Sequence, residues 1–124
     1  MIIYKKGNIL ESEADALVNT VNTQGVMGKG IALQFKNAFP SNYKIYQDIC
    51  RNGNFQIGDL LIVEENGLIS GKKTIINFPT KTSWRNPSEY SYIEKGLEKL
   101  VQVIEEKKLN SIAIPPLGSG NGGL

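Results

Sequence analysis

Glycine and amide residues gather in a first segment, residues 19–30, whose composition suits a phosphorylated ligand. It contains Asn19, Asn22, Gly25, Gly28 and Gly30. Glycine lets the backbone approach a ligand closely and adopt positive φ, and an asparagine amide can donate to and accept from sugar hydroxyls. The segment leads into a predicted helix, whose N-terminus attracts anions such as pyrophosphate. It is therefore either a ligand-binding loop or a structural turn in which nothing binds.

A second glycine-rich loop, residues 115–123, follows another predicted strand. Gly118, Gly120 and Gly123 match the GxGxxG pattern, but no acidic residue follows to complete a dinucleotide fingerprint. The first loop is not a P-loop either, because Gly30 stands where that motif needs Ser or Thr. Both loops follow strands, and ligands of open α/β sheets bind at the carboxyl edge of the strands. Together they predict a nucleotide-type ligand with a diphosphate.

A third segment, residues 77–86, places a lysine and an aromatic residue after a further strand. Taken alone, Lys81 is either a surface lysine or a polar group of the same crevice. Trp84 could stack on a base while Arg85 contacts phosphate, or Trp84 could cover the edge of the core. Cys50 lies on the apolar side of a predicted helix and is expected to be a small buried hydrophobe.

The overall composition excludes several classes of protein and of catalytic site. The 124 residues are 40% hydrophobic and 21% charged, as in globular proteins, which excludes a disordered chain or a coiled coil. Histidine is absent, which excludes His-based triads and HExxH zinc sites. A single cysteine predicts a reducing, cytoplasmic location, and no apolar run approaches the roughly 20 residues that span a membrane. The net charge of +2 does not discriminate between partners.

Strands and helices are expected to alternate, which predicts an α/β sandwich. The predicted strands are residues 2–4, 16–21, 60–63, 74–78 and 111–115, and the predicted helices are residues 30–39, 41–52 and 88–108. Pro40 is expected to end the first helix and Gly53 to end the second. Ser91 with Glu94 fits a capping box for the third helix, although Pro87 and Ser88 could start that helix a turn earlier. We expect one domain over residues 1–124, truncated at the C-terminus with its last helix missing.

Several motifs in order along the chain resemble a macro domain. They are residues 7–9, 15–22, 25–33 and 116–123. Residues 18–23, 25–30 and 77–81 resemble more narrowly the DarG branch, whose members remove ADP-ribose that a DarT toxin places on thymidine in single-stranded DNA. This resemblance implies a three-layer α/β/α sandwich with a mixed central sheet that binds ADP-ribose at the carboxyl edge of its strands.

The resemblance also assigns residues to the ligand. The turn at residues 7–9 would lie by the adenine, where many macro domains have Asp in place of Asn8; residues 19–30 would surround the distal ribose, and residues 117–122 would cradle the diphosphate. The implied ADP-ribose-binding residues are Asn8, Ile9, Asn19, Asn22, Gly25, Val26, Met27, Gly28, Gly30, Ile31, Thr80, Leu117, Gly118, Ser119, Gly120, Asn121 and Gly122.

Lys81 matches the lysine on which catalysis depends in the DarG branch and in a related human glutamate-linked ADP-ribose hydrolase. Its neutral amine could attack the anomeric carbon, or its ammonium could stabilise the departing thymine. In related hydrolases an acidic residue follows the second glycine-rich loop, beyond the position of Leu124.

The expected function is a DNA ADP-ribosyl glycohydrolase that acts as an antitoxin, with Trp84 and Arg85 holding the DNA strand and no metal or cofactor. The expected partners are ADP-ribose, ADP-ribosylated single-stranded DNA and a DarT-type toxin, with no membrane. The alternatives are a non-catalytic ADP-ribose-binding module, or a hydrolase of another small derivative such as the 1″-phosphate or an acetyl ester.

Overall fold

A mixed β-sheet forms the centre of the protein. The computed structural model describes residues 9–67, 71–83 and 88–117. The described strands lie in the order β2-β3-β1-β4, with β1 parallel to both β3 and β4 and with β2 antiparallel to β3. Their bounds are Ala16–Asn22 for β1, Leu61–Gly67 for β2, Gly71–Lys81 for β3 and Ile112–Ala113 for β4. The strand predicted at residues 2–4 lies outside the described residues.

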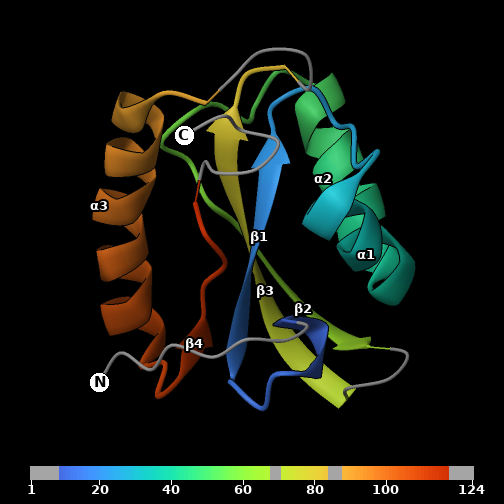
Figure 1. Ribbon diagram of the computed structural model, residues 1–124, viewed down its shortest axis with the longest axis vertical. Coiled ribbons are helices and arrows are strands. Elements are labelled where there is room, and N and C mark those ends of the chain that lie inside the picture. Colours follow the sequence, from blue (N-terminus) through green and yellow to red (C-terminus); the bar gives the residue numbers. More distant parts are fainter. Residues whose placement is uncertain (1–8, 68–70, 84–87, 118–124) are drawn as a thin grey trace.

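Helices cover both faces of this sheet, which confirms the predicted three-layer α/β/α sandwich. One face carries α3 and the other carries α1 and α2 (Figure 1). The helices span Gly30–Ala38 (α1), Pro40–Arg51 (α2) and Tyr90–Lys107 (α3), and a short 3-10 turn, η1, spans Ile9–Glu11. Across the described residues, no helix is long and apolar enough to cross a membrane.

The alternation of side chains along the central strands explains these layers, because successive residues of a strand point to opposite faces. Four of them, Ala16 and Val18 of β1 with Ile76 and Phe78 of β3, form one core cluster with α3. Their sequence neighbours Leu17 and Ile75 join α1 in a second cluster. All six side chains are fully buried. The runs of apolar residues in β1 and β3 therefore serve two cores at once.

Several boundaries differ from the sequence predictions. β2 extends to Gly67 instead of residue 63, and β4 is limited to Ile112–Ala113 within the predicted residues 111–115. β3 begins at Gly71 because its polar first residues pair with β2 in a hairpin, from Gly67 opposite Gly71 onward. Pro40 does not only end α1 but also occupies the first turn of α2, where its missing N–H costs nothing. The predicted capping box is wrong: α3 begins one residue earlier than Ser91, with Glu89 as its N-cap. Gly53, with φ of 71°, ends α2 as predicted.

Candidate functional site

The ends of β1 and β3 meet at one edge of the sheet, where α3 also begins (Figure 1). The pairing slips there, because Val21 lies opposite Pro79 whereas Asn22 lies opposite Lys81. Just beyond this irregularity, Thr23 donates two hydrogen bonds to the end of β3. Its N–H donates to the Lys81 carbonyl oxygen (3.1 Å) and its Oγ1 hydroxyl donates to the Thr82 carbonyl oxygen (3.0 Å). These two hydrogen bonds therefore link the first glycine-rich loop to the strand end that carries Lys81.

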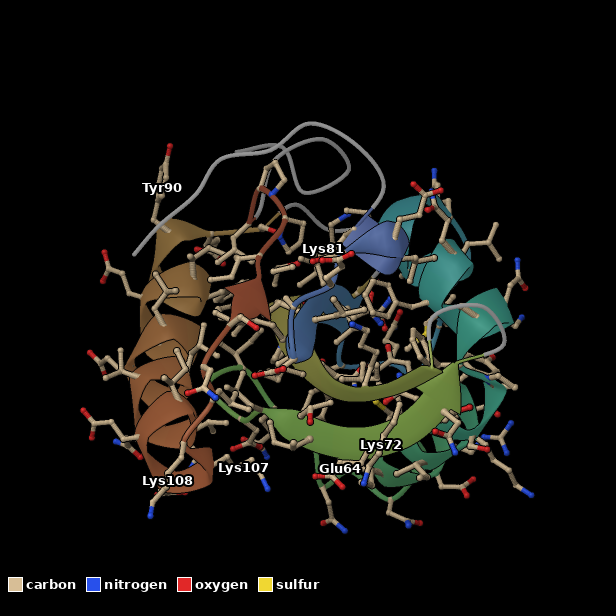
Figure 2. All side chains as sticks on the ribbon, turned by 90° about the horizontal axis from the view of Figure 1, so that it is seen from below. Glu64, Lys72, Lys81, Tyr90, Lys107 and Lys108 are labelled. Atoms are coloured by element: carbon tan, nitrogen blue, oxygen red, sulfur yellow. The ribbon has the colours of Figure 1, made fainter. Side chains whose placement is uncertain are left out.

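Lys81 itself is half-buried between α3 and the layer formed by α1 and α2 (Figure 2). Burial lowers the pKa of its ammonium below the ordinary value, and the positive charge of Lys29 lowers that pKa further. Lys29 is the N-cap residue of α1, so the first loop brings a second cation to the site. Both effects raise the fraction of neutral amine at Lys81 above that of an exposed lysine, and the neutral amine is the form that can act as a nucleophile or base.

Tyr92 of α3 lies near this strand end. Its hydroxyl lies within interaction range of the Glu89 carboxylate and of Thr82, the residue after Lys81. The hydrogen bond to Glu89 raises the pKa of Tyr92, with smaller contributions from burial and from the negative charge of the carboxylate. The start of α3 therefore contacts the strand end at Thr82.

Asn22 gives the first loop its shape. Its Oδ1 accepts the N–H groups of Gln24 (3.0 Å) and Val26 (3.3 Å), and its Nδ2 donates to the Val26 carbonyl oxygen (2.9 Å). The side chain is buried, with 6% of its surface exposed. Its amide thus folds the loop back on itself, a role that the sequence analysis did not assign. The ribose contact expected of Asn22 stays a prediction.

The glycines of this loop differ in what they require. Gly25 has a φ of 89°, and a Cβ there would stand 3.3 Å from Cβ of Cys50 and close to Gln47 on α2. Gly30 has a φ of 63° at the start of α1, whereas Gly28 has an ordinary backbone. Gly25 therefore serves the conformation that the composition suggested, and it lets the loop lie directly on α2.

Asn19 lies beneath the edge in a buried network of amides. Its Nδ2 donates to Asn77 Oδ1 (3.3 Å), and Asn77 in turn exchanges two hydrogen bonds with Asn42 of α2 (3.1 and 2.7 Å). All three side chains are fully buried. Within the described part of the chain, Asn19 Oδ1 has no hydrogen-bond partner. The sequence did not predict a role for Asn77 or Asn42, although an asparagine inside the apolar run of β3 indicates a buried polar contact.

The remaining predicted residues divide into three groups. Met27 and Thr80 are buried near the loop, and Val26 is more exposed. Ile9 and Ile31 are partly buried and pack against the core cluster around Leu17. Leu117 packs against the core cluster on the α3 side. The other predicted positions, Asn8, Trp84, Arg85, Gly118, Ser119, Gly120, Asn121 and Gly122, lie outside the described residues.

Cys50 is half-buried rather than fully buried as predicted, and it packs against the apolar cluster beneath the first loop. Burial raises the pKa of its thiol to about 11, although the Tyr46 hydroxyl, by hydrogen bonding, acts in the opposite direction. The thiol is therefore protonated near neutral pH, and a protonated thiol is a poor nucleophile.

A mixed sheet between helical layers, with a glycine-rich loop and a lysine at the carboxyl edge of its parallel strands, is typical of α/β proteins that bind ligands at that edge. The chain belongs to the macro-domain family, whose model, "Macro domain", matches residues 18–124.

Within this family the chain is similar to DarG proteins. It is 53% identical over its whole length to a DNA ADP-ribosyl glycohydrolase of Thermus aquaticus, of which it covers 34%. It covers 81% of the solved macrodomain of Mycobacterium tuberculosis DarG, at 52% identity and a TM-score of 0.94. It also resembles Thermosipho africanus DarTG, solved in complex with ADP-ribose, at 34% identity and a TM-score of 0.87 over 95% of this chain and 33% of that one. The chain spans about a third of the length of the curated relatives it matches.

Proposed function

We propose that this chain is a glycohydrolase domain that removes ADP-ribose from thymidine bases of single-stranded DNA and so reverses a DarT-type toxin. The observation that carries the proposal is Lys81, half-buried with a lowered pKa, and fastened through Thr23 to the loop that leads into α1. Support also comes from a relative, 53% identical over the whole chain, that is named a DNA ADP-ribosyl glycohydrolase.

The first loop is proposed to bind the distal ribose of ADP-ribose. Its backbone N–H groups and the N-terminus of α1 favour a ligand with negative charge, and Lys29 adds a cation at the same point. The diphosphate is assigned to residues 117–122, of which Leu117 alone is described. Under this assignment the anomeric carbon of the ribose would lie between the loop and Lys81.

Lys81 is proposed to act as the nucleophile. Its neutral Nζ attacks the anomeric carbon, a C–N bond forms, and the bond from that carbon to the thymine nitrogen breaks. The electron pair leaves with the thymine nitrogen, which takes up a proton released from Nζ as the ribose ring opens to an imine. Water then hydrolyses the imine, which returns the amine and releases ADP-ribose. The lowered pKa of Lys81 raises the fraction of neutral amine, which this role requires.

The DNA contacts and the cellular partner form the rest of the proposal. Trp84 and Arg85 are assigned to the DNA strand, because an aromatic ring stacks on bases and a guanidinium contacts phosphate. A DarT-type toxin is the proposed functional partner. A DNA substrate and a single cysteine both favour the reducing cytoplasm as the place of action.

The test is the release of ADP-ribose from a thymidine-ADP-ribosylated oligonucleotide by the parent chain, Lys81→Ala and Lys81→Arg. We expect both variants to lose at least about a hundredfold in rate, because neither offers a neutral amine. Both should still bind ADP-ribose in calorimetry. Cyanoborohydride added during turnover should trap an ADP-ribosyl adduct on Lys81 of the parent chain.

Other outcomes would contradict the proposal. Full activity in Lys81→Ala would remove Lys81 from the chemistry. Tight binding of ADP-ribose without release by the parent chain would indicate a binding module. Faster turnover of ADP-ribose 1″-phosphate or of an acetyl ester than of the oligonucleotide would indicate a hydrolase of small derivatives.

A further inference from the structure

Among the contacts between helix α2 and the first loop is a buried hydroxyl, that of Tyr46. Tyr46 Oη lies 2.8 Å from the carbonyl oxygen of Asn22 and 2.8 Å from its side-chain Oδ1. We infer that Tyr46 is a positioning residue, whose hydroxyl holds residues 22–30 in the conformation that binds ADP-ribose. This inference rests on the proposed function, because it takes that loop to be the ligand-binding one.

The hydroxyl must act as the donor in this contact. Asn22 Oδ1 already accepts the N–H groups of Gln24 and Val26, and a carbonyl oxygen can only accept. Burial strongly raises the pKa of Tyr46, so the phenol keeps its proton over the whole neutral range. Its single proton is shared between two oxygens of the residue where the β1–β3 pairing slips. Without the hydroxyl, buried acceptors would lose a donor.

Packing in the core holds the ring that carries this hydroxyl. The Tyr46 ring is fully buried and packs edge-on against Phe55, with ring centroids 6.1 Å apart. Val21 and Met27 complete the same cluster. The first turn of α2 is held independently, because Glu65 of β2 accepts the N–H of Asn42 (2.6 Å). The ring contact with Phe55 and the anchored first turn of α2 thus both constrain the donor that the loop contacts.

Asn22 connects the Tyr46 hydroxyl to two parts of the proposed site. Toward the loop, its amide sets the turn at Gln24 and Val26. Toward the strand end, its neighbour Thr23 bonds to the backbone of Lys81. One hydroxyl therefore fixes the junction from which both the ribose loop and the strand end that carries Lys81 extend.

Tyr46→Phe tests this inference, because it keeps the ring and removes only the hydroxyl. We expect the dissociation constant for ADP-ribose, measured by calorimetry, to rise about tenfold through the loss of one buried donor. In turnover of the modified oligonucleotide, KM should rise more than kcat falls. Tyr43→Phe is the matched control, because that hydroxyl, on the same helix, accepts from Gln47 (3.1 Å) and not from the loop. Its affinity should equal that of the parent chain.

Hydrogen exchange separates loop positioning from a general loss of stability. In Tyr46→Phe the amides of Gln24 and Val26 should exchange faster, whereas those of Leu17 and Val18 in β1 should not change. Unchanged affinity and unchanged loop exchange would overturn the inference, and so would equal losses of affinity in Tyr46→Phe and Tyr43→Phe. Failure of the parent chain to bind ADP-ribose would count against the proposed function. The hydrogen-exchange comparison would still decide whether Tyr46 holds the loop.

Discussion

The protonation of Lys81 depends on a second lysine, Lys29. Lys29→Gln removes a positive charge that lowers the pKa of Lys81, so that pKa should rise. Since a nucleophilic amine must be neutral, the rise of kcat/KM with pH should move to higher pH, and the rate at neutral pH should fall several-fold. The measurement is the pH profile of ADP-ribose release from the modified oligonucleotide.

Lys36→Gln controls for the loss of charge itself, because Nζ of Lys36 lies over the Tyr43 ring at 4.7 Å from its centroid. Its profile should match that of the parent chain. A profile that Lys29→Gln leaves in place would contradict the electrostatic coupling. An activity that instead decreases as pH rises would show that Lys81 works as a proton donor.

Residue types alone predicted some of this site. Composition left Lys81 open between a surface lysine and a functional one, and only the resemblance of residues 77–81 to the DarG branch favoured the functional one. Asn77 and Tyr46 were not identified, because their roles depend on partners far away in the chain. Asn77 bonds to Asn19, 58 residues earlier, and Tyr46 bonds to Asn22, 24 residues earlier. A sequence shows that a polar group is present but not which buried acceptor it serves.

Among the secondary-structure elements, α3 comes very close to the sheet at a glycine. Gly96 of α3 lies against the ring of Phe78, and a Cβ at Gly96 would overlap that ring. Gly96→Ala adds about 1 kcal/mol of helix propensity, but overpacking a fully buried ring costs more, up to about 3 kcal/mol. We expect the free energy of unfolding to fall by about 1–2 kcal/mol in urea titration. Ser91→Ala, at an exposed position of the same helix, is the control, and a Gly96→Ala variant as stable as that control would contradict the packing argument.

The positions of the elements were predictable because apolar runs and helical spacing depend on short stretches of sequence. Their ends were not. The start of β3 looked too polar for a strand, yet Lys73 is buried there with Nζ donating to the carbonyl oxygens of Ser12 (3.0 Å) and Ala14 (2.8 Å). These carbonyls come from the segment before β1, so the lysine is satisfied only once the sheet has formed. The start of α3 was also predicted wrongly. The helix begins at Tyr90 although, among the described residues, no side chain caps its first turn.

At the scale of the whole molecule, the site and the core share one cluster. Val21, Met27, Tyr46 and Phe55 are its buried members, with Cys50 packed against it. Two of these groups ionise, and both have a raised pKa in the folded protein, chiefly through burial. The stability of the fold and the conformation of the loop should therefore respond together to alkaline pH.

The sign of that response follows from proton binding. The pKa of Cys50 rises from an ordinary 9.0 to about 11 on folding, so between these values the unfolded chain has released a proton that the folded protein keeps. The free energy of unfolding should then fall as pH rises from 9 to 11, and Tyr46 should extend the fall to higher pH. Cys50→Ala loses some packing at pH 7, but its decline from pH 9 to 11 should be shallower. Urea titrations at pH 7, 9, 10 and 11 measure the slope. Parallel curves for the parent chain and Cys50→Ala would show that the thiol does not drive it.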